Sequence, residues 1–136
     1  MARFGVTETI EVPVEKVWKL LRNFGDVSWF PGLGESARVE GEGVGMSRFF
    51  GVPGAEIQET LTAFDEDART FSYEIPNNLP LPLEGYLATV VLKDAGANKT
   101  EIDWSCEAEP TGTHEEAEAA IHGMYKMLIS CVRDAL

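Results

Sequence analysis

Alternation of apolar and polar residues is clearest near the end of the chain. Over residues 99–109, Ile102, Trp104, Cys106 and Ala108 alternate with Glu101, Asp103, Ser105, Glu107 and Glu109. Because successive side chains of a strand point to opposite faces of a sheet, this pattern predicts a strand with one dry face and one wet face. Similar but weaker patterns predict strands over residues 3–12, 35–42, 46–50, 56–64, 69–76 and 84–94.

Two further segments carry apolar residues at helical spacing. Pro13 suits the first turn of a helix, and the apolar positions Val14, Val17, Trp18 and Leu21 continue it through about Phe24. Residues 25–34 are a loop or a short second helix. After the last strand, Thr113 and Glu116 form a Thr-x-x-Glu capping box, which predicts a helix of about 24 residues, or about 36 Å, to the C-terminus. Its apolar stripe is Ala117, Ala120, Ile121, Met124, Leu128 and Cys131 or Val132.

This order of elements predicts an α+β fold with an antiparallel sheet, and we expect residues 1–136 to form a single domain. A continuous meander of seven strands must curl, and one long helix must cover its concave face. A helix with small and flexible residues, such as Ala120, Gly123 and Met124, need not fill that face. We therefore expect an internal cavity between the sheet and the C-terminal helix, where ligand sites of ~300–1,000 Å³ are typical.

A glutamate interrupts the apolar face of the strand at residues 56–64. Ile57, Leu61 and Ala63 share that face with Glu59, whereas Gln58, Thr60 and Thr62 lie on the other. A buried carboxylate without a partner must find one or take up a proton.

The turn residues at 51–54, Gly-Val-Pro-Gly, predict a hairpin with the preceding strand. Centring the turn between Pro53 and Gly54 pairs Phe50 with Ile57, Arg48 with Glu59, and Met46 with Leu61. Two interpretations of the Arg48–Glu59 pair follow. It is a solvated pair at the rim of the sheet, contributing under ~1 kcal/mol, or it points into the cavity and orients a ligand, in which case breaking it costs about 3–5 kcal/mol.

Charge and composition exclude several classes of function. The chain has 11 basic and 23 acidic residues and a net charge of −12, which argues against nucleic acid and anionic membrane surfaces as partners. No apolar run is long enough to span a bilayer and the N-terminus lacks the apolar stretch of a signal peptide, so we expect a cytoplasmic protein without membrane insertion. The two cysteines are expected to be reduced. His114 and His122 lie far apart, and no metal site or cofactor motif is expected.

Several loose motifs occur in a characteristic order. They are Val17-Trp18 with Phe24, Trp29-Phe30-Pro31-Gly32, residues 59–65 with Arg69, residues 71–75, Trp104, and Gly123-Met124-Tyr125. Together they resemble the START-like (SRPBCC) superfamily over essentially the whole chain. That superfamily includes the birch-pollen allergen group, polyketide cyclase/dehydrase-type proteins and the plant abscisic acid receptors. The resemblance implies a helix-grip fold: a curved seven-stranded antiparallel sheet wrapped around a long C-terminal helix, with two short helices after the first strand.

The resemblance also implies roles for individual residues. Glu59 matches a family glutamate that points into the cavity, and Tyr73 and Tyr86 match aromatic lining positions. Val52-Pro53 occupies the place of a loop that gates the pocket in the hormone receptors. The receptors hold a ligand carboxylate with a lysine, and no lysine lies at a plausible inward position here, so hormone sensing is not implied.

Three hypotheses for function follow from the resemblance. The first is a carrier or sensor that binds a hydrophobic small molecule or lipid. Its cavity-lining residues are Trp29, Phe50, Glu59, Phe71, Tyr73, Tyr86, Trp104, Met124 and Leu128. The second is a polyketide cyclase/dehydratase-type enzyme in which Arg48 holds an enolate, Glu59 acts as acid or base, and Tyr73 assists. The third is a protein-interaction module of the chaperone-activator type. The sequence leaves the ligand and the oligomeric state open.

Overall fold

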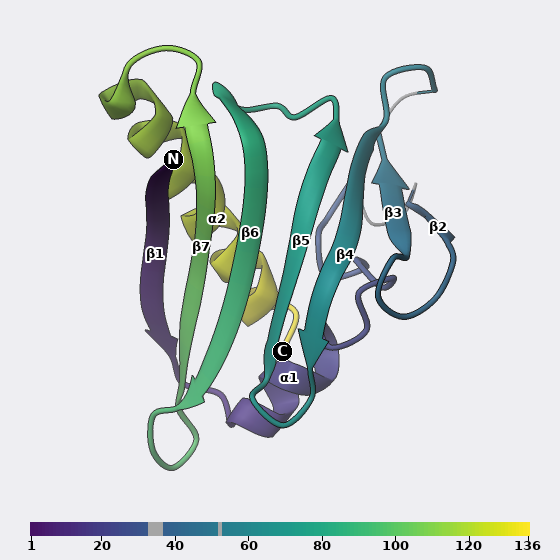
Figure 1. Cartoon of the computed structure of the whole chain (residues 1–136). Coiled ribbons are helices and arrows are strands. Elements are labelled where there is room, and N and C mark those ends of the chain that lie inside the picture. Colours follow the sequence, from purple (N-terminus) through teal and green to yellow (C-terminus); the bar gives the residue numbers. More distant parts are fainter. Residues whose placement is uncertain (33–36, 52) are drawn as a thin grey trace.

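Seven strands and two helices make up the part of the chain that the structure describes. The computed structural model describes residues 1–32, 37–51 and 53–136. The elements run in the order β1 (Ala2–Ile10), α1 (Val14–Leu21), β2 (Arg38–Glu40), β3 (Ser47–Phe50), β4 (Ile57–Asp65), β5 (Thr70–Asn77), β6 (Leu83–Asp94), β7 (Thr100–Pro110) and α2 (His114–Asp134) (Figure 1). Parts of the predicted loop at 25–34, the strand at 35–42 and the turn at 51–54, including Val52, lie outside the described residues.

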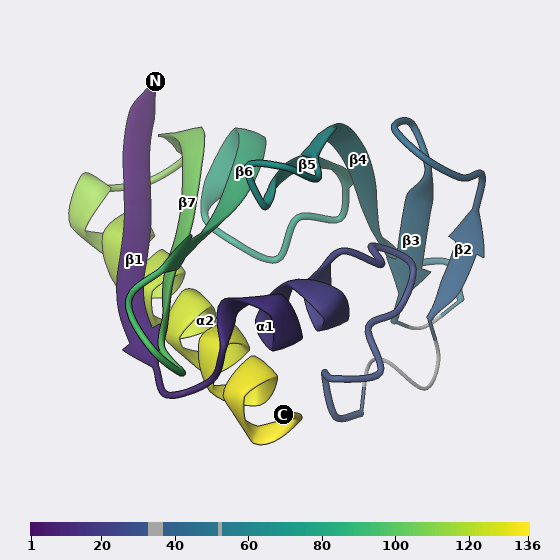
Figure 2. The same ribbon diagram turned by 90° about the horizontal axis from the view of Figure 1, so that it is seen from below.

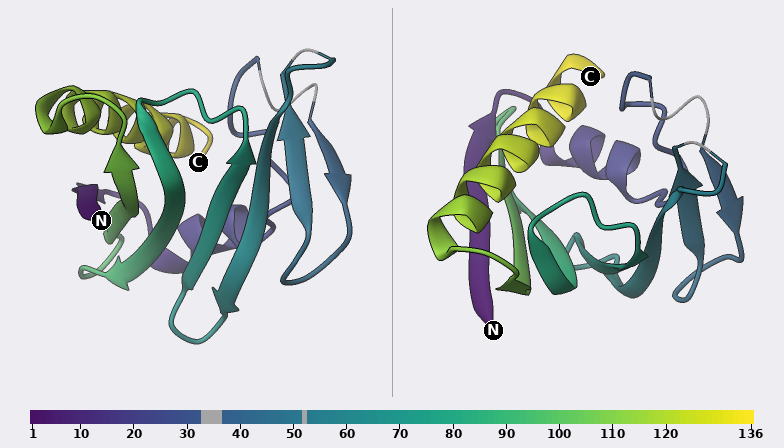
Figure 3. Two further views of the ribbon diagram at one scale, coloured as in Figure 1. Left: turned by 45° about the horizontal axis from the view of Figure 1, so that its top comes forward. Right: turned by 90° about the horizontal axis from the view of Figure 1, so that it is seen from above.

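The strands form one antiparallel sheet in the order β1-β7-β6-β5-β4-β3-β2. The sheet curls, and both helices lie on its concave side (Figure 2). Helix α2 packs mainly against β1 and β7, and α1 packs against β6. The predicted α+β helix-grip architecture, with seven strands and a long C-terminal helix, is therefore confirmed. Helix α2 lies over the edge of the sheet formed by β1 and β7, and β3 and β4 lie on the side away from it (Figure 3).

The register of the β3–β4 hairpin follows the predicted pairing. Arg48 lies opposite Glu59, and Phe50 lies opposite Ile57. One step further from the turn, the Leu61 backbone N–H donates to the Met46 carbonyl at 2.9 Å. The hairpin thus brings the arginine and the glutamate to the same face of the sheet.

Strand β4 departs from the predicted alternation beyond Leu61. The register with β5 shifts between Leu61 and Ala63, and Ala63 is exposed instead of facing the core. A bulge of this kind puts one extra residue into a strand and changes which side chains point inward. As a result Phe64 turns inward and stacks on Trp18, with 5.5 Å between ring centroids.

The segment after α1 forms turns, so the second short helix implied by the resemblance is not found in the described residues 22–32. The Asp26 carboxylate accepts a hydrogen bond from the Ser28 backbone N–H at 2.9 Å. A side chain that bonds to the backbone two residues on competes with helix formation. These turns carry Val27, Trp29 and Phe30 to the concave face.

Helix α2 begins as the capping box predicts, because the Thr113 side chain accepts a hydrogen bond from the Glu116 backbone N–H at 3.1 Å. Its fully buried face is Ala117, Ile121, Tyr125, Ile129 and Val132. Met124 and Leu128, which were predicted on the central stripe, are only half-buried at its side. The helix is thus rotated slightly from the predicted orientation, and this rotation leaves those two side chains beside a hollow.

Candidate functional site

A cavity of about 210 Å³ lies on the concave side of the sheet. It is enclosed by β3, β4, β5 and β7, by α2, and by loop residues before β2 and after β5. The lining residues are Val27, Trp29, Phe30, Arg48, Phe50, Ile57, Glu59, Tyr73, Ile75, Pro80, Trp104, Met124, Met127 and Leu128. Its volume is below the ~300–1,000 Å³ common for small-molecule sites. The cavity therefore suits a compact apolar ligand.

The placement of α2 accounts for the hollow. The helix packs over β1 and β7, and the flexible side chains of Met124, Met127 and Leu128 face the part of the sheet that it does not reach. Across the cavity, strand alternation aims Arg48 and Phe50 of β3, and Ile57 and Glu59 of β4, to the concave side.

Arg48 and Glu59 form an ion pair inside the protein. The Arg48 Nε donates to Glu59 Oε1 at 2.6 Å, and Nη2 lies 2.6 Å from the same oxygen. Arg48 is 5% exposed and Glu59 is 9% exposed. This burial is incompatible with a solvated pair at the rim of the sheet. Both residues line the cavity, as the second interpretation of the sequence requires.

Arg48 is held by a second set of contacts. Its Nη1 donates to the backbone carbonyl of Phe24 at 2.9 Å, and its guanidinium carbon lies 3.9 Å from the centroid of the Phe24 ring. The same carbon lies 5.4 Å from the centroid of the Tyr73 ring. A cation over an aromatic face is attracted by the ring quadrupole, more strongly where water is excluded. The guanidinium is therefore fixed in place from three directions.

The three tyrosines of the chain are buried and keep their protons. Burial raises the pKa of Tyr73, the Glu59 carboxylate raises it further, and Arg48 acts in the opposite direction. Burial likewise raises the pKa of Tyr86 and of Tyr125, whose hydroxyl oxygens share a hydrogen bond of 2.5 Å. The Trp104 indole N–H donates to the Tyr73 hydroxyl at 3.0 Å. At neutral pH the tyrosines are hydrogen-bonding groups without charge.

A family model described as "Polyketide cyclase / dehydrase and lipid transport" matches residues 1–132. The chain belongs to this family. Membership supports the binding of hydrophobic ligands in general.

Solved structures agree with the family match. An uncharacterized protein from Bacillus thuringiensis is 28% identical, with a TM-score of 0.85 and coverage of 98% of each chain. The protein XoxI from Bacillus cereus is 29% identical, with a TM-score of 0.84 and coverage of 99% of this chain and 95% of that one. Norcoclaurine synthase from Thalictrum flavum shares the fold at 18% identity, with a TM-score of 0.73 and coverage of 98% and 85%. No curated protein matches the chain.

Most of the site residues predicted from the sequence of this family member lie together in the wall of the cavity. The cavity is lined by the predicted residues Trp29, Arg48, Phe50, Glu59, Tyr73, Trp104, Met124 and Leu128. Phe71 and Tyr86 do not line it. Phe71 packs against Trp18 and Phe24, and the Tyr86 hydroxyl is occupied by Tyr125 beneath α2.

Sequence reasoning missed other lining residues for identifiable reasons. Ile57 and Ile75 lie two positions from Glu59 and Tyr73, so strand alternation alone was sufficient to include them. Val27, Phe30 and Pro80 come from irregular segments, which carry no period from which an inward direction can be read.

The described ranges contain no group of three or more His, Cys, Asp or Glu side chains placed to hold a metal ion. Within the same ranges no helix is long and apolar enough to cross a membrane. Cys106 and Cys131 are free thiols, and burial raises the pKa of Cys106.

Proposed function

We propose that this chain binds a hydrophobic small molecule or lipid in the cavity between the sheet and α2, as a carrier or sensor. The observation that carries the proposal is a buried ion pair, Arg48–Glu59, in the wall of an otherwise apolar cavity. Ligand sites are typically apolar hollows in which a few polar groups fix orientation. The family description, which names lipid transport, supports a ligand of this kind.

Stability of the fold is a poor explanation for the pair. Burying two charges costs desolvation that their attraction only partly offsets, and apolar residues of similar volume are often as stabilising or more so. The neighbouring positions in the cavity wall, Phe50, Ile57 and Ile75, hold apolar side chains, so the fold does not require a charge in this wall. A role toward a ligand accounts for charges at this position.

The shared fold supports the same proposal. The norcoclaurine synthase structure is described in complex with dopamine and hydroxybenzaldehyde, which are both small aromatic molecules. At 18% identity the likeness extends to the fold alone. It supports the view that a sheet and helix in this arrangement can enclose compact ring compounds.

Filling the cavity tests the proposal. Leu128→Trp adds bulk to a half-buried lining position, whereas Leu87→Trp makes the same change at a side chain that is 38% exposed and does not line the cavity. Calorimetric titration with naphthalene should give binding to the wild type and to the Leu87 variant, and none to the Leu128 variant. Native mass spectrometry of freshly purified protein should show any co-purified ligand with the same pattern. Equal binding by all three proteins would contradict the proposal.

A second candidate is catalysis of the cyclase/dehydratase type, favoured by the convergence of Arg48, Glu59 and Tyr73 on one cavity. In that case Glu59 transfers a proton and Arg48 stabilises an enolate. Polyketide-like carbonyl substrates should be turned over by the wild type and much more slowly by Glu59→Gln. Equal turnover by both proteins, or none by either, would count against catalysis and leave the binding proposal standing.

A further inference from the structure

One carboxylate oxygen of Glu59 has no hydrogen-bond partner among the described residues. Both contacts from Arg48 converge on Oε1. No hydrogen bond between described residues reaches Oε2. Among the same residues, every side-chain nitrogen or oxygen that is fully shielded from solvent has a hydrogen-bond partner. Within the described part of the chain, Oε2 therefore lies against open space and not against a hydrogen-bond partner. Because Glu59 is 9% exposed and lines the cavity, that space is the cavity.

The charge of the site is balanced before any ligand enters. Arg48 and Glu59 are the only charged side chains among the described residues that line the cavity, and they carry one positive and one negative charge. Arg48 is committed to Glu59 Oε1, to the Phe24 carbonyl and to the Phe24 ring. A ligand carboxylate would add a second negative charge beside Glu59, and the described lining residues offer no further cation to neutralise it. A buried charge of either sign without a partner is costly.

Size limits the ligand further. An apolar cavity of ~150 Å³ in another protein takes up benzene, and this one measures about 210 Å³. Trp29, Phe50 and Trp104 supply aromatic walls. A compact molecule of one or two rings fits these dimensions and this lining.

We propose that the cavity selects an uncharged one- or two-ring compound that donates a hydroxyl or N–H hydrogen to Glu59 Oε2, and that it discriminates against carboxylates. The inference rests on the proposed function, since it specifies the ligand class of the same site. The hydroxyl or N–H group of the ligand donates a hydrogen bond to Glu59 Oε2, and its rings fill the apolar space around that oxygen. A compound of the same shape without the donor leaves a charged oxygen desolvated.

Four naphthalene compounds test the selectivity by calorimetric titration at pH 7: naphthalene, 2-naphthol, 2-methoxynaphthalene and 2-naphthoate. Wild type should bind 2-naphthol about 10- to 100-fold more tightly than naphthalene or 2-methoxynaphthalene, the factor expected for a hydrogen bond to a charged group. 2-Naphthoate should bind more weakly than naphthalene. If 2-naphthol has no advantage over the methoxy compound, or if 2-naphthoate binds best, the selectivity is wrong although the cavity binds ligands. If none of the four compounds binds, the proposed function fails with it.

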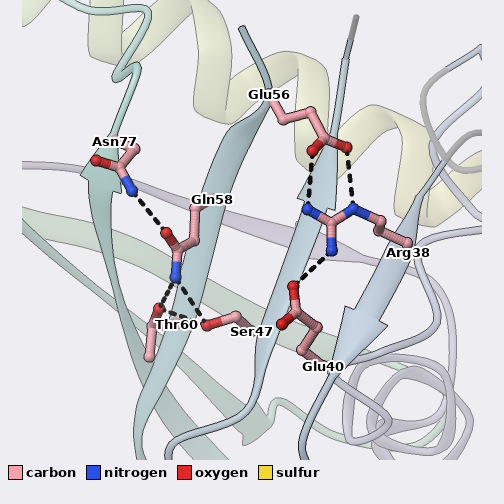
Figure 4. A network of polar contacts seen from close by, with 7 residues as sticks. All are labelled: Arg38, Glu40, Ser47, Glu56, Gln58, Thr60 and Asn77. Atoms are coloured by element: carbon pink, nitrogen blue, oxygen red, sulfur yellow. Dashed lines mark hydrogen bonds and ion pairs between the residues drawn. The ribbon is translucent and has the colours of Figure 1, made fainter. Parts of the chain in front are cut away.

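Variants of the ion pair connect the selectivity to Glu59. The double variant Arg48→Met/Glu59→Leu should still bind naphthalene, but its preference for 2-naphthol should fall below about 3-fold because a hydrogen bond to a charged group is lost. The matched control removes the Arg38–Glu56 ion pair (Figure 4). Arg38 lies on β2 and Glu56 just before β4, and neither residue lines the cavity. Arg38→Met/Glu56→Leu should keep the wild-type preference.

A single substitution gives an independent readout if the double variant fails to fold. Glu59→Gln keeps the shape of the side chain and leaves Arg48 without its anionic partner, so 2-naphthoate should become the tightest of the four ligands. Loss of the preference in the Arg38–Glu56 control, or an unchanged order of affinities in Glu59→Gln, would overturn the assignment of Glu59 as the group that selects the ligand.

Discussion

Replacing Arg48 with methionine would isolate a buried carboxylate. Arg48 and Glu59 are 5% and 9% exposed, so Glu59 would keep its desolvation cost and lose the cation 2.6 Å away. Removing one partner of a buried ion pair typically costs about 3–5 kcal/mol. The same substitution at Arg38, whose side chain is 51% exposed, should cost little because solvent screens its ion pairs with Glu40 and Glu56. We expect a difference of at least ~2 kcal/mol between the two variants.

Urea denaturation followed by tryptophan fluorescence measures this difference, provided that the dependence of the unfolding free energy on urea is the same for all variants. The double variant Arg48→Met/Glu59→Leu should recover most of the loss, since apolar residues of similar volume replace buried pairs with little cost. An Arg48→Met protein as stable as the Arg38→Met control would refute the reasoning. A double variant as unstable as the single one would assign the cost to the lost hydrogen bond with the Phe24 carbonyl instead.

Three further predictions concern the buried tyrosines and two glycines. Burial raises the pKa values of all three tyrosines, so the unfolded chain loses these protons at a lower pH than the folded protein. The free energy of unfolding should therefore fall above pH ~10, by up to about 1.4 kcal/mol per pH unit per tyrosine. Urea denaturation measured between about pH 8 and pH 11 would disprove this if the stability stayed constant. Tyr125→Phe leaves the Tyr86 hydroxyl without its partner and should cost about 1–3 kcal/mol, most of which Tyr86→Phe should not add again in a double-mutant cycle. Gly5→Ala should lower the melting temperature, because the new Cβ would lie 2.9 Å from Ser105 Cβ on the neighbouring strand. Gly123→Ala lies in a helix with nothing within 4 Å of the new Cβ, so it should raise stability by about 0.5–1 kcal/mol. The opposite order of stabilities would contradict the packing argument.

Local patterns were sufficient to predict the fold and the central pair of the site. Turn residues and alternation together determine a hairpin register, and the predicted register, with Arg48 opposite Glu59, is the one observed. The capping box at Thr113 likewise marked the start of α2. These features depend on residues close together in the chain, so they can be read from the sequence.

Features set by distant contacts were not predictable in this way. The bulge that exposes Ala63 turns Phe64 onto Trp18, which is far away in the sequence. The rotation of α2 depends on which of two overlapping apolar stripes meets the sheet, and the stripe that meets it includes Tyr125, which the predicted stripe does not. Its buried partner, Tyr86, lies on β6. The predicted lining also includes Phe71 and Tyr86, but Phe71 packs against Trp18 and Phe24, and the Tyr86 hydroxyl bonds to Tyr125.

The donation from Arg48 to the Phe24 carbonyl has a consequence for how ligand preference can change. The same guanidinium holds the carboxylate at the polar end of the cavity and the main chain that leads to Trp29 and Phe30 in its wall. Ligand specificity and the shape of the cavity therefore both depend on the Arg48 side chain. A substitution at Arg48 will therefore change the carboxylate and the 24–30 segment together, whereas a substitution at Glu59 leaves the bond from Arg48 to the Phe24 carbonyl in place.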